Sequence, residues 1–283
     1  MIAIGFIDYY LNEWHAEKYP AWIEEASAGR MKVAYAYGLT NVPGRPSNAE
    51  WCERKGITLL DSIAEVVERC DALVVLSPDN PEYHEELSQL PLRSGKPVFV
   101  DKTFAPDLAT AKRLFALAEA HGTPMYSTSA LRYAAEYGAL DMAGVGSVLS
   151  FGPGKYGNYA VHQAEPIVAL LGTEAERVMW TGTADTPALV IGFADGRQAT
   201  MHLYGDGCPF GMAFHGTAEE GGGKSAFVTV QSDFFAAFIA KLVEFFDGGK
   251  PPVAKEETLA IAAILEAGAK AAAAPFEWIA VAK

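Results

Sequence analysis

The first part of the chain alternates short apolar runs with longer segments whose apolar residues recur at helical spacing. The apolar runs predict buried strands over residues 1–7, 31–37, 57–60, 72–76 and 98–100. The helically spaced segments predict helices over residues 12–28, 48–55, 62–70, 82–90 and 108–120. Strands that alternate with helices in this way are typical of a doubly wound parallel sheet of the α/β class.

Residues at the ends of these segments support the predicted boundaries. Asp107 can cap the helix that follows it, and Ser62 and Glu65 have the three-residue spacing of a capping box. Gly29 and Gly122 stand where two of the predicted helices end. The helix boundaries are therefore marked by chemistry as well as by periodicity.

After about residue 124 the pattern changes to short β-rich runs followed by two helices. The runs cover residues 147–151, 177–181, 188–193, 198–204 and 226–230, and Asp195-Gly196 between two of them is a hairpin signal. Apolar and alanine-rich segments predict helices over 233–246 and 256–274. We therefore expect two domains, a Rossmann-like domain over 1–123 and an α+β domain with a mostly antiparallel sheet over 124–283.

Composition excludes several classes of function. A net charge of −13 argues against nucleic-acid binding through a basic face. No apolar run approaches the roughly 18 residues of a membrane span, and the N-terminus lacks the features of a secretory signal. Three widely spaced cysteines predict neither a disulfide framework nor a metal site and suit a reduced, cytoplasmic protein. The expected partner is a small-molecule substrate.

Lys102 follows the predicted strand 98–100, at the sheet edge where ligands bind in open α/β folds. A lysine there can be a solvated side chain, or it can hydrogen-bond a substrate oxygen. Gly95 to Ala105 resembles the "GK-x-V-x-x-EKP-x-A" signature of the Gfo/Idh/MocA oxidoreductases, with Asp101 in place of Glu and Thr103 in place of Pro. This resemblance favours the functional interpretation of Lys102.

Further segments resemble the same family in the same order. Ser77-Pro78-Asp79 followed by His84 resembles its "tPn…H" segment, and residues 129–133 resemble "N-x-R-[FY]". Residues 144–148 resemble its "G-x-iG-x-v" turn. Asn158 and His162 resemble its "D-x-x-x-H" motif, with asparagine in place of aspartate. Their spacing puts both side chains on one face if the segment is helical. Pro166 is compatible with a helix here only if it falls within the first turn. A histidine at such a position can be structural or can serve as an acid–base group.

The resemblance implies NAD or NADP as cofactor and a sugar, polyol or related hydroxyl compound as substrate. It implies catalytic roles for Lys102, His162 and Asn158, and no metal. The implied cofactor contacts are Ile7, Asp8, Tyr10, Ser77, Pro78, Asp79, Asp101 and Lys102. The implied substrate contacts are Lys102, Arg132, Tyr156, Asn158, Tyr159 and His162.

The sequence departs from the family at the first loop. Glycines of a G-x-G-x-x-G fingerprint let the backbone approach a diphosphate, but the corresponding positions hold residues such as Asp8 and Tyr10. The second strand also ends without the acid that would accept ribose hydroxyls, although Thr40, Asn41 and Arg45 could serve a 2′-phosphate. The dinucleotide-binding loop is therefore degenerate.

Two hypotheses follow. The first is an NAD(P)-dependent oxidoreductase with an atypical cofactor loop, which Lys102 and His162 favour. The second is a family member that has lost the dinucleotide and acts as a cofactor-free acid–base enzyme or as a ligand- or partner-binding protein, which Asp8 and Tyr10 favour. Family analogy also predicts a homo-oligomer formed through the sheet of the second domain.

Overall fold

The computed structural model describes residues 1–217 and 222–283, which form two compact units. The first unit combines Met1–Thr128 with Ala236–Lys255, and the second combines Ser129–Phe235 with Glu256–Lys283. The chain thus returns to its first unit after building most of the second. The domain limits predicted from the sequence, 1–123 and 124–283, did not anticipate this return.

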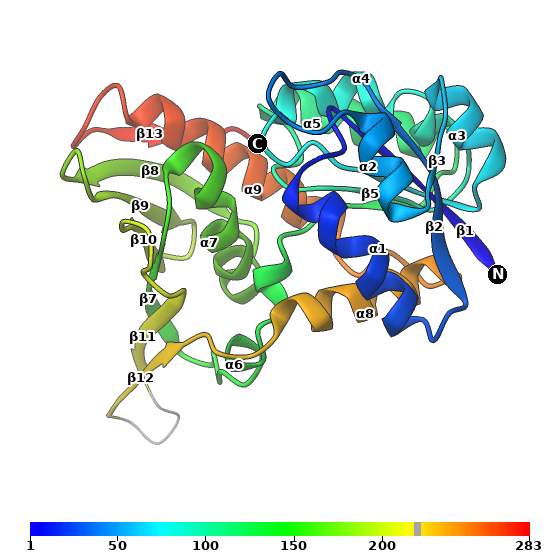
Figure 1. The fold of residues 1–283 in the computed structure, drawn as a ribbon. Coiled ribbons are helices and arrows are strands. Elements are labelled where there is room, and N and C mark those ends of the chain that lie inside the picture. The colour runs from blue at the N-terminus through cyan, green and yellow to red at the C-terminus, as the bar shows by residue number, and fades with distance from the viewer. Residues whose placement is uncertain (218–221) are drawn as a thin grey trace. The chain divides into compact units, whose positions relative to one another are not determined.

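The first unit alternates strands and helices (Figure 1). Its elements up to residue 128 are β1 (Ile2–Asp8), α1 (Trp14–Ala26), β2 (Met31–Gly38), α2 (Asn48–Lys55), β3 (Thr58–Leu59), α3 (Ile63–Arg69), β4 (Ala72–Val75), α4 (His84–Ser88), β5 (Val98–Val100), α5 (Leu108–Ala120) and β6 (Met125–Tyr126). The predicted caps are present, since the side chains of Ser62 and Asp107 accept backbone hydrogen bonds from Glu65 and Thr110. The helix predicted over 82–90 is shorter, because 3₁₀ turns at Pro81–Tyr83 and Pro91–Arg93 flank α4.

The six strands form a parallel sheet in the order β3-β2-β1-β4-β5-β6. All residues of β4 and β5 are buried, as expected for parallel strands covered on both faces. The order reverses direction between β1 and β4, which creates the crevice where ligands bind in this fold. The predicted Rossmann-like α/β fold is confirmed.

Helix α8 (Phe234–Phe246) supplies aromatic side chains to the core of the first unit. The Phe238 ring lies 5.7 Å from the ring of Tyr19 on α1 and 5.3 Å from that of Phe99 on β5. Phe245 meets Tyr126 edge to face at 4.9 Å. These contacts explain why residues 236–255 belong to the first unit.

The second unit is built on a seven-stranded sheet in the order β12-β11-β7-β10-β9-β8-β13. Its neighbouring strands are antiparallel except for β7 and β10, which confirms the mostly antiparallel prediction. Its elements are α6 (Ala135–Gly138), β7 (Val145–Gly152), α7 (Tyr156–Leu171), β8 (Ala175–Gly182), β9 (Pro187–Phe193), β10 (Gln198–Leu203), β11 (Gly211–Thr217), β12 (Gly223–Thr229), α9 (Lys255–Ala271) and β13 (Trp278–Ala280).

Some details of the second unit differ from the sequence prediction. The hairpin signal at Asp195-Gly196 joins β9 to β10 as expected, but residues 194–197 separate the strands instead of two residues. Strands β11 and β13 were not predicted, because Gly211, His215 and Gly216 interrupt the apolar alternation in the first and the second is only three residues long.

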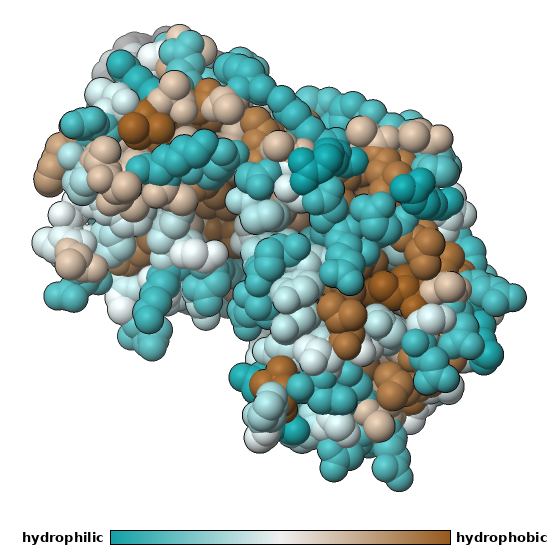
Figure 2. Space-filling model, turned by 90° about the horizontal axis from the view of Figure 1, so that it is seen from above, coloured by the Kyte–Doolittle hydropathy of each residue, from teal (hydrophilic) through white to brown (hydrophobic). Residues whose placement is uncertain are grey.

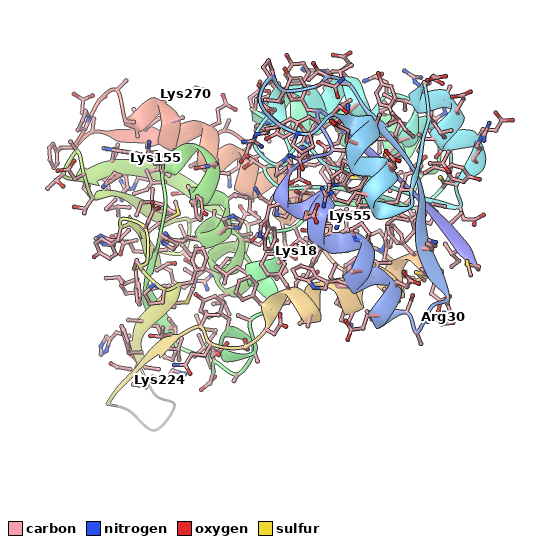
Figure 3. The ribbon with its side chains drawn as sticks, in the orientation of Figure 1. Lys18, Arg30, Lys55, Lys155, Lys224 and Lys270 are labelled. Atoms are coloured by element: carbon pink, nitrogen blue, oxygen red, sulfur yellow. The ribbon has the colours of Figure 1, made fainter. Side chains whose placement is uncertain are left out.

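The visible surface is largely hydrophilic, with scattered apolar patches (Figure 2). Four of the labelled basic side chains lie on different elements, Lys18 on α1, Lys55 on α2, Lys224 on β12 and Lys270 on α9 (Figure 3). Within residues 1–217 and 222–283, no helix has the length and apolarity needed to cross a membrane. The same residues contain no group of three or more His, Cys, Asp or Glu side chains placed to hold a metal ion.

Truncation of Phe238 tests the contribution of α8 to the first core. Because this side chain is 1% exposed and contacts two rings, we expect Phe238→Ala to lower the free energy of unfolding by about 3–5 kcal/mol. Urea denaturation followed by tryptophan fluorescence measures the change. The control is Phe276→Ala, which removes a ring that is 72% exposed and should change stability by less than about 0.5 kcal/mol.

Candidate functional site

The carboxyl ends of β1, β4 and β5 bring most of the predicted cofactor residues to one edge of the parallel sheet. β1 ends at Ile7-Asp8, β4 leads into Ser77-Pro78-Asp79, and β5 leads into Asp101-Lys102. The registers Ile7 with Val75 and Val75 with Val100 align these three ends. Neighbouring parallel strands therefore place the three segments side by side at the switch point.

Lys102 is a buried cation at this edge. It is 7% exposed, and its Nζ donates to the backbone carbonyl of Pro78 at 3.3 Å. This long contact leaves donor capacity on the ammonium group, which has three N–H bonds. The interpretation of Lys102 as a solvated surface lysine is wrong.

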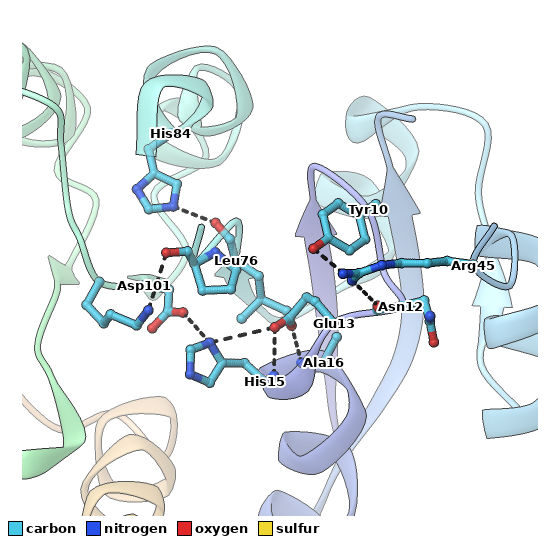
Figure 4. A network of polar contacts seen from close by, with 11 residues as sticks. Tyr10, Asn12, Glu13, His15, Ala16, Arg45, Leu76, His84 and Asp101 are labelled. Carbon is cyan, nitrogen blue, oxygen red and sulfur yellow. Dashed lines mark hydrogen bonds and ion pairs between the residues drawn. The ribbon is translucent and has the colours of Figure 1, made fainter. Parts of the chain in front are cut away.

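Asp101 connects the end of β5 to helix α1. Its Oδ2 lies 2.8 Å from Nδ1 of His15, and both side chains are buried (Figure 4). Burial alone opposes ionisation of Asp101, but His15 and Lys102 outweigh burial and hold the pKa of the carboxyl below its usual value. Asp101 is thus an ionised acid between two basic side chains.

Glu13 caps helix α1 with its own side chain. Its Oε2 accepts the backbone N–H of His15 at 2.7 Å, and its Oε1 accepts the backbone N–H of Ala16 (Figure 4). The residue is 8% exposed, and burial raises the pKa of its carboxyl to about 7 although His15 and these N–H groups act in the opposite direction. The positive end of α1 therefore already carries an acidic group.

Asp8 ends β1 as a second buried acid. It is 1% exposed, and neither carboxylate oxygen has a hydrogen-bond partner of good geometry in the described part of the chain. Burial raises the pKa of Asp8 well above its usual value, and the charge of Glu13 raises it further, against smaller effects of the Tyr9 and Tyr10 backbone N–H groups.

This loop does not fit the diphosphate of a dinucleotide as it stands. A diphosphate in this fold binds to the N–H groups that begin the first helix. Here Glu13 occupies the N–H groups of His15 and Ala16, and the N–H of Leu11 donates to Oδ1 of Asn48 at 2.8 Å. Asp8 adds a second buried acid at the end of β1, next to this loop.

The positions that could bind the adenosine ribose are also used internally. Nδ2 of Asn48 donates to the carbonyls of Gly38 and Thr40, and Oδ1 of Asn41 accepts the backbone N–H of Asn48. A Cβ on Gly38 would lie 2.4 Å from the Asn48 amide, so this position requires glycine. The predicted 2′-phosphate ligand Arg45 instead donates to the hydroxyl of Tyr10 at 3.1 Å.

The segment after β4 has a special backbone conformation. Ser77 is buried and has φ +83°, a region that non-glycine residues rarely adopt, and its Oγ donates to the carbonyl of Asn80. His84 is fully buried, with Nε2 2.6 Å from the carbonyl of Leu76 and Nδ1 3.0 Å from that of Phe104. His84 therefore joins the ends of β4 and β5 through two buried backbone carbonyls. Asp79 itself is exposed.

In the second unit, Asn158 and His162 lie on helix α7, so the four-residue spacing does put them on one face. Pro166 lies well inside the helix, contrary to the expectation that it requires a place in the first turn. The Nδ1 atom of His162 is 2.7 Å from the hydroxyl of Ser129, and its ring contacts those of Tyr159 and Phe210. Ser129 thereby orients the imidazole.

Two predicted substrate residues have structural partners. Arg132 pairs with Glu165 and Glu257 through Nε and Nη2 at 2.7 and 2.5 Å. The hydroxyl of Tyr156 donates to the carbonyl of Leu265 at 2.9 Å. Asn158 and Tyr159, in contrast, are exposed. The predicted site residues are thus divided between the two units, and each unit holds a cluster of its own.

The sequence analysis missed the roles of Glu13 and Asn48. The helix was expected to begin at Asn12, which hid the capping side chain of Glu13. Asn48 read as the first residue of a helix, and nothing local indicated that it would bond Leu11, which is 37 residues away.

Comparison with protein families identifies the first unit. Residues 32–128 match the model of the Gfo/Idh/MocA family, described as an oxidoreductase family with an NAD-binding Rossmann fold. The match begins within β2 and leaves out β1, the first loop and α1. Over these residues the match agrees with the family resemblance of the signature around Lys102, and it supports the expectation of an enzyme.

Solved structures share the fold over the whole chain. Myo-inositol 2-dehydrogenase from Lactobacillus plantarum has a TM-score of 0.78 at 15% identity, covering 99% of both chains. GenD2 from gentamicin A biosynthesis, in complex with NAD, has a TM-score of 0.76 at 16% identity, covering 100% of this chain and 97% of its own. An oxidoreductase from Bacillus cereus has a TM-score of 0.75 at 14% identity, covering 100% and 99%. No curated protein matches the sequence significantly.

Asp8→Asn tests the buried acid at the end of β1. A carboxyl whose pKa is raised by folding binds more protons in the native than in the unfolded state, so its contribution to stability falls as pH rises above its ordinary value of 3.8. We therefore expect Asp8→Asn to be more stable than the natural chain by roughly 1–3 kcal/mol at pH 8.

The advantage should largely vanish near pH 3, where Asp8 is mostly protonated in both the folded and the unfolded chain. Urea denaturation at the two pH values measures it. A natural chain that is as stable as Asp8→Asn at pH 8 would show that Asp8 carries no unfavourable charge.

Proposed function

Because its Rossmann unit belongs to the Gfo/Idh/MocA oxidoreductase family, we propose that this protein transfers a hydride between a nicotinamide cofactor and a small hydroxyl compound. The substrate class that we propose is a sugar, a polyol or a related compound. The two myo-inositol- and gentamicin-related structures that share the fold support this class by analogy.

One observation carries the proposal. Lys102 is buried at the carboxyl edge of the parallel sheet, beside the ionised Asp101 and at the position of the family's catalytic lysine. Burying an ammonium group is costly unless a specific interaction requires it. A substrate oxygen that carries negative charge during oxidation is such a partner.

The proposed roles follow from the chemistry of the side chains. Lys102 donates a hydrogen bond to the reacting oxygen and stabilises the charge on it. His162, oriented by Ser129, accepts the hydroxyl proton, and Asn158 four residues before it binds a substrate hydroxyl. The nicotinamide, when bound, supplies the hydride acceptor.

Lys102→Ala and His162→Ala test these roles. We expect each to lower kcat/KM at least 100-fold, because each removes a group that acts on the reacting oxygen or its proton. The measurement is reduction of NAD⁺ or NADP⁺ at 340 nm across a panel of polyols and sugars. Circular dichroism should show an unchanged fold.

The matched controls are Lys18→Ala, which removes an exposed lysine of α1, and His121→Ala, which removes an exposed histidine. Both should keep the activity of the natural chain. Full activity in Lys102→Ala and His162→Ala would refute the proposed site.

The occupied first loop favours a second candidate. A chain whose Glu13 and Asp8 exclude the diphosphate would use the same clusters for cofactor-free acid–base chemistry or for binding a sugar-like ligand. Calorimetric titration with the four nicotinamide dinucleotides separates the candidates, because only the oxidoreductase requires one of them to bind.

We further propose a homo-oligomer formed through the sheet of the second unit. Strands β7, β11 and β12 surround a hollow of about 570 Å³ that is lined in part by Leu149, Phe214 and Phe227. Phe227 is 68% exposed and Leu149 is 38% exposed. Exposed apolar side chains on one sheet face are typical of a surface that another chain covers.

Phe227→Asp tests the oligomer. A charge in the apolar hollow should shift the mass measured by size-exclusion chromatography with light scattering toward that of one chain, 30.3 kDa. Phe276→Asp, at a ring that is 72% exposed on another segment, is the control and should leave the mass unchanged. A natural chain that elutes as a monomer would refute this proposal.

A further inference from the structure

Two N–H groups in the first turn of α1, those of His15 and Ala16, are already bonded to a carboxylate. Glu13 is the N-cap residue, with extended backbone angles of φ −127° and ψ 172°, and both of its carboxylate oxygens accept N–H groups of the turn. The N–H of Leu11, just before the helix, is bonded to Asn48. A dinucleotide can reach these donors only if the Glu13 carboxylate moves away.

Asp8 provides an independent indication that the loop is poised for another group. Its carboxylate is almost completely buried, its oxygens have no hydrogen-bond partner of good geometry within the described residues, and the backbone N–H groups of Tyr9 and Tyr10 face it. A buried carboxylate without hydrogen-bond partners lowers the stability of the fold, and here it lies close to a second acid, Glu13. The two acids would both face an incoming diphosphate.

The charged groups around Glu13 come from every neighbouring element. Asp8 and Tyr10 belong to the end of β1 and its loop, His15 and Tyr19 to α1, and Asp101 to the end of β5. Lys102 lies next to Asp101, Arg45 contacts Tyr10 from the loop after β2, and Asp79 faces Tyr10 from the loop after β4. His15 is the basic group closest to Glu13, at 3.8 Å, but it is also paired with Asp101.

We propose that Glu13 occupies the diphosphate subsite as an internal anion, so that a nicotinamide dinucleotide binds only by displacing this carboxylate into water, with release of a proton where Glu13 is protonated. This inference rests on the proposed function, because it concerns the cofactor of that reaction. It differs from the usual arrangement of the fold, in which the helix N-terminus receives the ligand directly.

The pH dependence follows from the state of Glu13 before binding. With a carboxyl pKa of about 7, Glu13 is mostly protonated at pH 6 and mostly ionised at pH 8.5. A Glu13 carboxylate that leaves this buried position for water returns toward its ordinary pKa of 4.5, so displacement releases a proton at pH 6 and almost none at pH 8.5. Release of one proton weakens affinity by up to about tenfold for each pH unit below the pKa of about 7.

The experiment is calorimetric titration of NADH and NADPH into the natural chain, Glu13→Gln, Glu13→Ser and Glu17→Gln, at pH 6 and pH 8.5. Two buffers of different ionisation enthalpy at pH 6 give the number of protons released. Serine is a favourable N-cap, so Glu13→Ser keeps the helix capped if glutamine does not. Glu17→Gln removes the same charge from the next turn of α1, where Glu17 pairs with Arg54 and Lys55.

We expect the natural chain to bind one dinucleotide about tenfold more weakly at pH 6 than at pH 8.5. At pH 8.5, Glu13→Gln and Glu13→Ser should bind at least tenfold more tightly than Glu17→Gln, and at pH 6 they should release fewer protons. Binding by the Glu13 variants alone would support the internal anion while refuting the oxidoreductase function of the natural chain.

Glu13 variants that bind no more tightly than Glu17→Gln would overturn the inference and leave the proposed function standing. No binding by any folded variant at either pH would overturn both.

Discussion

Three acids converge at one edge of the parallel sheet with few basic groups to balance them. Asp8 ends β1, Glu13 caps α1 and Asp101 follows β5, and all three are buried. Asp101 has the closest basic partner, because its Oδ2 lies 2.8 Å from Nδ1 of His15, and Lys102 is the next residue in the chain. Glu13 therefore depends on backbone N–H groups for stabilisation, and the oxygens of Asp8 have no hydrogen-bond partner of good geometry among the described residues. The conformation of the first loop follows from which partner each of the three acids has.

This distribution of charge gives the two halves of the edge different character. The half after β4 and β5 keeps a buried cation and a strained turn, features that accompany ligand binding in enzymes. In the half after β1, side chains are bonded to the N–H groups of Leu11, His15 and Ala16. The family match begins at residue 32, so it includes Lys102 but leaves out these N–H groups.

The sequence predicted the fold well because the fold depends on patterns that are local. Apolar runs such as Val98–Val100 and helical stripes such as Leu108–Ala120 are visible within a few residues, and their alternation determines the class. For the candidate site, the signature pointed to Lys102, which is buried at the sheet edge, and the spacing placed Asn158 and His162 on one helix; the roles of these residues stay predictions. Glu13, Asn48 and the partners of Arg132 were not predictable, because their bonds join residues 33 to 125 positions apart or depend on which residue begins a helix.

The return of residues 236–255 to the first unit has a consequence for synthesis on the ribosome. Phe238 and Phe245 complete a core whose other rings, Tyr19, Phe99 and Tyr126, emerge long before them. At 5–20 residues per second, the nascent Rossmann unit must wait on the order of ten seconds for its last helix. The N-terminal unit therefore cannot complete its core before residues 129–235 of the second unit have been made. Until then the sheet surface beneath α8 is available to chaperones.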